Sequence, residues 1–197
     1  MDRAELDRAG FLKTAGVGTV LASFPLLTEV AWADDSDDDE GRRRTFYFVA
    51  LSGVEESVTG GDSIAMAGCG RFNPAGRRVH GGGDFVHFDG TQFGTPDNII
   101  ATGKWRAGPL ISFQEIGTWG VGVAGILEMR ARLIPCDGPE IRRATIKVVC
   151  NLGPAGIITS PFQQEGYTLT LPTGVTFSPF TPNIGLTLFT RRCREVE

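Results

Sequence analysis

The segment from Ile64 to Asp89 reads IAMAGCGRFNPAGRRVHGGGDFVHFD and contains two β-type runs on either side of a turn. The turn, residues 73–77, places proline and glycine where a tight reversal of the chain favours them. When Phe72 is paired with Val79 across this turn, the apolar side chains of both runs meet on one face. The segment therefore predicts an antiparallel hairpin in a single register.

This register also sets the other cross-strand partners and places glycines between them. Glycine weakens a flat strand, and it marks a bend, a bulge or a close approach of two backbones. A sheet needs bends of this kind in order to close into a barrel. The expected pairs are Met66 with Phe85 and Ile64 with His87, and the glycines are Gly68, Gly70, Gly81, Gly82 and Gly83.

A second hairpin is predicted by the alternation of residue types further along the chain. Apolar residues occupy every second position on both arms of residues 127–150, and most of the residues between them are charged or polar. Matching Leu133 to Ala144 brings Leu127 opposite Cys150, and the two inward sets then coincide. This register predicts that Cys150 points into the core.

The composition agrees with one turn-rich β domain. The 197 residues include 27 glycines and 11 prolines, and the 41% hydrophobic and 21% charged fractions are near globular averages. We therefore predict an all-β fold, a single antiparallel β-barrel or sandwich of about eight to ten short strands. The further strand candidates are Arg44 to Ser52, Ile99 to Trp105, Leu110 to Ile116, Tyr167 to Leu171, Val175 to Phe180 and Gly185 to Thr190.

The first thirty-three residues have the layout of a secretory signal. Basic residues precede an uncharged run, residues 14–28, which is too short to span a bilayer as a helix, and Ala31-Trp32-Ala33 offers a cleavage site. We predict a signal peptide over 1–33, a flexible acidic and basic tail over 34–44 and a β-barrel domain over 45–197. The protein is then secreted or held in the cell envelope, without a membrane span after cleavage. An N-terminal helix of a cytosolic protein is the alternative.

The N-terminal segment also resembles a known export signature. Residues 8–13, Arg-Ala-Gly-Phe-Leu-Lys, are similar to the twin-arginine signal, in which paired arginines precede x-Phe-Leu-Lys. Ala9 stands where that signature has its second arginine, so the Sec and twin-arginine routes both stay open. The resemblance implies an exported bacterial protein.

Charge is distributed unevenly along the chain. Residues 34–40 hold six acidic side chains, whereas residues 41–197 hold sixteen basic and thirteen acidic ones. The acidic run is expected to be solvated, since it lacks the glycine and the distal glutamate of an EF-hand calcium loop. The second hairpin carries an outward basic stripe, which is expected to be a solvated face, with an anionic polymer as the alternative partner and no nucleic acid. The stripe consists of Arg130, Arg132, Arg142, Arg143 and Lys147.

Four cysteines in an exported chain favour two disulfides, with three possible connectivities. Cys136 and Cys150 lie far out of register on one predicted hairpin, so a bond between them is not expected. Buried thiols without disulfides are the alternative, and a zinc site would need closer spacing. The other two cysteines are Cys69 and Cys193.

Gly61-Asp62-Ser63-Ile64 resembles the GDS block of SGNH-type esterases, and Asp84-Phe85-Val86-His87 has the D-x-x-H form of their acid and base. The resemblance implies a hydrolase with Ser63 as the nucleophile and His87 as the base. In that family the D-x-x-H block lies near the C-terminus of an α/β fold, whereas here it lies in a β-hairpin. We favour the structural interpretation, a loop-to-strand transition and a hairpin histidine.

No cofactor is expected from the remaining motifs. Residues 120–125, GVGVAG, match G-x-G-x-x-G, but a dinucleotide site also needs a following helix and an acid after the next strand. Alternation with period two follows the motif, so a glycine-rich connection is predicted. The two histidines, His80 and His87, lie on opposite faces of a regular strand and cannot share a metal ion without a bulge.

Gly103-Lys104-Trp105 has the G-x-W form of the first lipocalin strand, and the glycine-rich hairpins resemble the small secreted barrels of the dirigent and allene-oxide-cyclase type. This resemblance implies an eight-stranded barrel whose interior can hold a hydrophobic small molecule.

We predict an exported, non-enzymatic β-barrel that binds a small hydrophobic ligand or a cell-surface partner. A barrel enzyme, either a cyclase-like isomerase or the hydrolase above, and a structural envelope protein are the alternatives. The residues expected to line a ligand site are Met66, Phe85, His87, Trp105, Met129 and Ile146.

The mature protein is expected to begin at Asp34, because Ala31-Trp32-Ala33 is the A-x-A site that follows the apolar run. N-terminal sequencing of the protein recovered outside the cells measures this directly. A chain that starts at Met1 in the medium would contradict cleavage.

Overall fold

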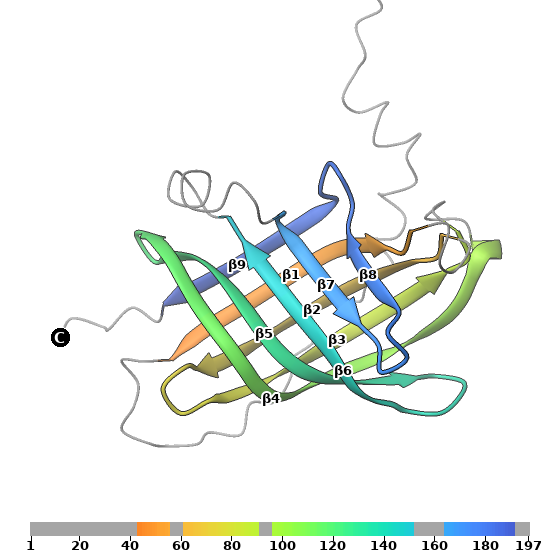
Figure 1. The fold of residues 1–197 in the computed structure, drawn as a ribbon, viewed down its shortest axis with the longest axis horizontal. Coiled ribbons are helices and arrows are strands. Elements are labelled where there is room, and N and C mark those ends of the chain that lie inside the picture. Colours follow the sequence, from red (N-terminus) through yellow and green to blue (C-terminus); the bar gives the residue numbers. More distant parts are fainter. Residues whose placement is uncertain (1–42, 56–60, 91–95, 152–163, 192–197) are drawn as a thin grey trace, which may run out of the picture.

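A computed structural model describes residues 43–55, 61–90, 96–151 and 164–191 of the chain (Figure 1). These residues form nine β-strands and one short 3-10 helix, η2 (Pro96–Asn98), without an α-helix. All nine strands belong to one antiparallel sheet, which confirms the predicted all-β fold. The predicted signal peptide lies outside the described residues. The strands are β1 (Arg44–Gly53), β2 (Ser63–Asn73), β3 (Arg78–Phe88), β4 (Ile99–Trp119), β5 (Gly122–Pro135), β6 (Ile141–Cys150), β7 (Gly166–Thr170), β8 (Thr176–Pro179) and β9 (Gly185–Arg191).

The sheet closes into a ring. Each strand from β1 to β7 pairs with the next one along the chain, and β8 pairs back to β1, where Ser178 lies opposite Gly53. β9 pairs with the first part of β1 and reaches the start of β5 (Figure 1). Closure removes the open edges of a flat sheet and encloses the inward side chains in one core.

The β2–β3 hairpin has the predicted register. Phe72 lies opposite Val79, Met66 opposite Phe85 and, at the far end, Ile64 opposite His87. The prediction is confirmed because the turn and the alternation of the two arms are local signals that agree with each other.

The β5–β6 register differs from the prediction by two residues. Ala144 lies opposite Ala131, and Cys150 lies opposite Gly125, in each case two residues earlier in β5 than expected. An even shift keeps the same side chains inward. Cys150 is therefore fully buried, as predicted, although the partner expected for it, Leu127, was wrong.

Next to the turn the difference is three residues, since Leu133 lies opposite Ile141 rather than Ala144, and a β-bulge then reduces it to two. Between two paired rungs, the single residue Arg132 of β5 faces both Arg142 and Arg143 of β6. Arg143 has a φ of 66°, the left-handed conformation that accommodates an extra residue in one strand. Arginine rarely adopts this conformation, so nothing in the local sequence marks the bulge.

The single strand β4 replaces two predicted ones. The runs 99–105 and 110–116 were expected to be separate strands, but one strand of 21 residues contains both. The register shifts between Ala107 and Leu110, where Gly108 and Pro109 lie. Proline has no N–H group to donate to the neighbouring strand. Here the pairing with β5 omits Gly108 and Pro109 and resumes at Leu110, so β4 continues as one strand.

The interior is built on rings that rest on glycine backbone. Trp105 is 1% exposed and stacks on Phe48 with ring centroids 5.5 Å apart. Its indole Nε1 donates a hydrogen bond to the carbonyl of Ala67 at 3.0 Å. A Cβ at Gly68 would lie 2.1 Å from the Trp105 ring. Close approach of a ring to the backbone is thus one reason for the predicted glycines of β2.

Replacing Gly68 by alanine is expected to destabilise the barrel by about 1–3 kcal/mol, because the new methyl group overlaps the Trp105 ring and strands β1 to β4 would have to shift. Urea denaturation measures the change in the free energy of unfolding. Gly76→Ala in the β2–β3 turn is the matched control, since its Cβ would come no closer than 3.3 Å to any neighbour. Equal midpoints for Gly68→Ala and the control would contradict the ring-on-backbone contact.

Candidate functional site

Five of the six residues predicted to line a ligand site lie in the packed core of the barrel. None of them is more than 4% exposed, and all belong to one cluster of contacting inward side chains. They therefore fill the interior together with the aromatic rings around them. These residues are Met66, Phe85, Trp105, Met129 and Ile146.

His87, the sixth residue, lies half-buried at one end of the barrel. Its Nε2 lies 3.3 Å from a carboxylate oxygen of Asp62, and the two side chains are 25% and 20% exposed. This contact does not meet the geometry of a hydrogen bond, and the buried Nε2 has no hydrogen-bond partner among the described groups. The imidazole meets the Phe177 ring edge-on, with centroids 5.6 Å apart. This polar pair against an aromatic ring is the part of the predicted site that solvent reaches.

Ser63 does not share a face with His87. The register places Ser63 opposite Phe88 and His87 opposite Ile64, so the two side chains point to opposite faces of the hairpin. The hydroxyl of Ser63 is buried and donates a hydrogen bond to the carbonyl of Gly90 at 2.8 Å. A nucleophile needs its base within hydrogen-bond reach, and this pair is not arranged in that way.

The other two motifs fold as connections and strands. Gly120, with a φ of 59°, turns the chain between β4 and β5, and a strand follows it where a dinucleotide site requires a helix. His80 and His87 lie on opposite faces of β3, as predicted, because their partners Arg71 and Ile64 do. In the part of the chain that the structure describes, no three His, Cys, Asp or Glu side chains gather as metal ligands.

The expected framework of two disulfides is wrong. No disulfide joins the three described cysteines, and since Cys193 could bond to only one of them, two disulfides would need such a bond. Cys69 lies on the outer face of β2, Cys136 is exposed after β5, and Cys150 lies inside, where its thiol donates to the Thr187 carbonyl at 3.4 Å. Partial burial raises the pKa of the Cys69 thiol, so its reactive thiolate is scarce at neutral pH.

The predicted basic stripe faces outward and is partly neutralised. One carboxylate, Glu140, lies 3.4 Å from Arg132 and 3.2 Å from Arg142. Arg130 donates a hydrogen bond to the hydroxyl of Thr145 at 2.9 Å. Pairing on the same surface favours the expected solvated face over a dedicated polymer site.

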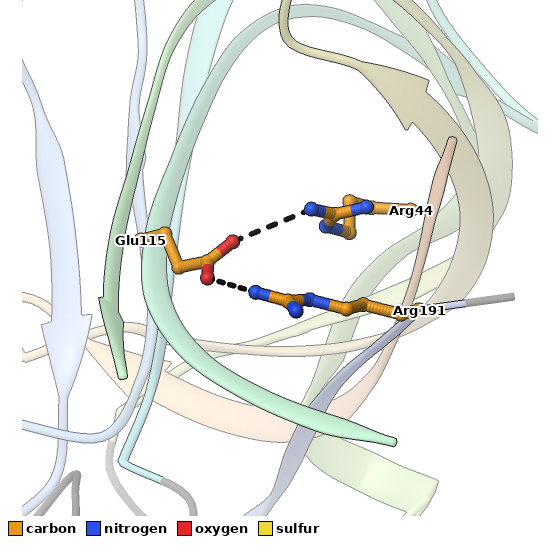
Figure 2. Close-up of polar contacts among 3 residues, drawn as sticks. All are labelled: Arg44, Glu115 and Arg191. Atoms are coloured by element: carbon orange, nitrogen blue, oxygen red, sulfur yellow. Dashed lines mark hydrogen bonds and ion pairs between the residues drawn. The ribbon is translucent and has the colours of Figure 1, made fainter. Parts of the chain in front are cut away.

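Three charged residues meet at the other end of the barrel, a site that the sequence did not indicate (Figure 2). Glu115 of β4 accepts from Arg44 of β1 at 3.5 Å and from Arg191 of β9. The side chains of Arg44, Glu115 and Arg191 are 17%, 33% and 41% exposed, respectively. The Nε of Arg44 is buried without a hydrogen-bond partner among the described residues.

An aromatic cluster lies on the core side of these charges. Phe113 packs edge-on against Phe72 at 4.7 Å and against Phe189 at 5.7 Å. The paired charges therefore cover an apolar floor at the mouth of the barrel. Alternation could have marked each of these residues as inward, but Glu115 lies 71 and 76 positions along the chain from its partners Arg44 and Arg191.

Comparisons with protein-family models, with curated proteins and with solved structures gave no match to this chain. Among the described residues, no helix has the length and apolar character of a membrane span.

Tyr167 connects β7 to β1 and β2 from inside the barrel. Its phenol donates a hydrogen bond to the carbonyl of Ile64 at 2.5 Å, and its own backbone carbonyl accepts from the hydroxyl of Ser52 at 2.6 Å. The ring is fully buried against Phe48, with centroids 5.3 Å apart. Burial raises the pKa of the Tyr167 phenol well above its usual value, because the ionised form would lose its hydration.

Tyr167→Phe is expected to change how stability depends on alkaline pH. Above the ordinary tyrosine pKa of about 10, unfolded chains lose a proton that the folded protein keeps, so the free energy of unfolding falls as pH rises. The variant lacks this fall, but it loses a hydrogen bond at a cost of about 1 kcal/mol at neutral pH.

Urea denaturation of both proteins at neutral pH and at about pH 11 measures the difference. The gap in unfolding free energy between wild type and Tyr167→Phe should narrow at the higher pH. Tyr47→Phe, which changes the other tyrosine of the chain, is the matched control. A gap of the same size at both pH values would contradict the raised pKa.

Proposed function

We propose that this protein is an exported, non-enzymatic β-barrel that binds a partner at the cell surface through its exterior. The observation that carries the proposal is the packing of the interior. Five of the six side chains expected to line a ligand site instead contact one another in a core whose members are at most 7% exposed. A barrel of about eight strands has an interior just wide enough for such side chains or for one small ligand.

A hydrophobic ligand inside the barrel would have to displace part of this core. Trp105 would lose its hydrogen bond to Ala67 and its stacking on Phe48. Truncating or displacing a large core side chain costs about 3–5 kcal/mol, which the ligand would need to offset. The surface-partner interpretation needs no such rearrangement.

The arrangement of the candidate catalytic groups also supports a non-enzymatic role. The Ser63 hydroxyl donates to Gly90 on the face opposite His87, and the Cys69 thiol is held in its protonated form by its raised pKa. Nucleophilic catalysis requires an activated nucleophile and a positioned base. These groups serve as structural members of β2 and β3 instead.

One observation favours a second candidate, a polar small molecule at the His87 end. The Nε2 of His87 is buried without a hydrogen-bond partner among the described groups, beside Asp62 and Phe177. Buried polar groups in proteins are normally paired. A ligand with one donor or acceptor and an apolar part would pair this atom and cover the Phe177 ring.

Sedimentation with isolated cell envelopes tests the proposed function. Protein isolated from its source is mixed with envelope fragments or with the soluble fraction of the same cells. We expect it to sediment with the envelopes, and retention in the supernatant would contradict the surface role.

Native mass spectrometry of the same preparation should give the mass of the polypeptide alone. A co-purifying small molecule that is lost in His87→Ala would favour the second candidate, and ester hydrolysis lost in Ser63→Ala would favour an enzyme.

A further inference from the structure

One end of the barrel, which we call the cationic end, carries a large excess of arginine. It comprises the start of β1, the β2–β3 turn, the tip of the β4–β5 hairpin and the end of β9. In these described segments, residues 44–46, 71–80, 115–122 and 189–191, there are five arginines and a single carboxylate, that of Glu115. The arginines are Arg44, Arg71, Arg77, Arg78 and Arg191.

The strand register makes these segments neighbours on one rim. Arg44 lies opposite Phe72 of β2 on one side and opposite Arg191 of β9 on the other. Phe72 in turn lies opposite Val79, next to the β2–β3 turn. The backbone N–H of Arg191 donates to the carbonyl of Val121 at 2.9 Å, which joins β9 to the hairpin tip. Figure 1 shows all four segments at the left side of the barrel.

Two large apolar side chains project from this rim. Trp119 is 65% exposed and Val121 is 51% exposed, on either side of Gly120. The left-handed backbone of Gly120 lets β4 reverse into β5 with only Gly120 and Val121 between them. The tip is therefore a small apolar wedge beside a row of positive charges.

Four of the five arginines at this end fall into two groups. Glu115 occupies both Arg44 and Arg191 at the mouth of the barrel (Figure 2). Arg77, the last residue of the β2–β3 turn, and Arg78, the first residue of β3, are both exposed. Exposed arginines next to an exposed tryptophan are the combination that an anionic lipid surface recognises.

We propose that the cationic end docks on an anionic lipid bilayer, with Trp119 and Val121 inserted at the level of the headgroups and Arg77 and Arg78 against lipid phosphates. This inference deepens the proposed function, on which it rests, by naming the surface partner. An anionic polymer would satisfy the arginines equally well, but it would leave the Trp119 and Val121 side chains in water. A bilayer accommodates both, because tryptophan is favoured at the membrane interface.

Co-sedimentation with protein-free vesicles tests the proposal. One set of vesicles is pure phosphatidylcholine, and in the other about a third of the lipid is phosphatidylglycerol. We expect binding to the anionic vesicles only, and we expect it to weaken when the salt is raised from about 0.1 M to about 0.5 M.

Trp119→Ala should lower the affinity about tenfold, through lost burial of its ring. Arg77→Asn with Arg78→Gln should lower it about twentyfold, at roughly fivefold per arginine. Asparagine suits position 77, where φ is 50°.

Two matched control substitutions lie at the opposite end of the barrel. The control proteins have the same N-terminal residues as the Trp119 and arginine variants. Ile100→Ala removes a side chain that is 53% exposed at the start of β4, and Arg142→Gln removes a charge that is 74% exposed at the start of β6. Both controls should keep the wild-type affinity. The proposal is overturned if neutral vesicles bind equally well, if no vesicle binds, or if the controls weaken binding as much as the Trp119 variant. Sedimentation with cell envelopes but not with vesicles would leave the proposed function standing and show that its partner is not lipid.

Discussion

The contact of the Trp105 ring with the glycine backbone of β2 is the constraint on which this barrel depends. The ring occupies the space that a side chain at Gly68 would need, and its indole N–H donates to the neighbouring carbonyl of Ala67. Three strands are tied together by this residue, since Trp105 belongs to β4, packs on Phe48 of β1 and hydrogen-bonds to β2. Because protein interiors are close-packed, a ring that lies this near the backbone leaves little freedom in how the sheet curls around it.

That constraint also determines where the protein can interact with other molecules. An interior filled by aromatic rings and aliphatic side chains is a stabilising core, and its polar groups are engaged in internal hydrogen bonds such as that of Tyr167 with Ile64. Among the described residues the buried polar side chains are Ser52, Ser63 and Thr187, so the charged side chains lie on the exterior and at the two ends of the barrel. The ends differ: one presents His87 with Asp62, and the other presents arginines around Glu115. Strand β4 runs from one end to the other, which explains why its exposed apolar residues gather near its two termini.

Local patterns predicted those parts of the fold whose signals lie within one hairpin. The β2–β3 register followed from a five-residue turn and from Phe72 opposite Val79. The β5–β6 register failed by two residues because the turn pairs Leu133 with Ile141, three residues from the expected Ala144, and the left-handed backbone at Arg143 then changes the register by one. The Glu115 site was missed for a different reason. Its partner Arg44 is 71 positions away in the chain, so the contact exists only once the whole ring has closed. Each of these failures concerns a non-local contact or a strained backbone, for which alternation of residue types carries no information.

The charge at the cationic end follows from the same alternation that builds the core. Arg44 and Arg191 occupy inward positions in their strands, so one carboxylate between them is enough to cover the phenylalanine cluster at the mouth. Arg77 ends the β2–β3 turn and Arg78 begins β3, and both side chains are exposed to solvent. The arginines that pair with Glu115 at the mouth are therefore distinct from Arg77 and Arg78, which are exposed to solvent. Salt screens exposed charges more strongly than partly buried pairs, so the outer arginines respond to ionic strength while the mouth stays closed. In the proposed docking, salt therefore weakens the attraction of Arg77 and Arg78 to the lipid more than it weakens the ion pairs at the mouth.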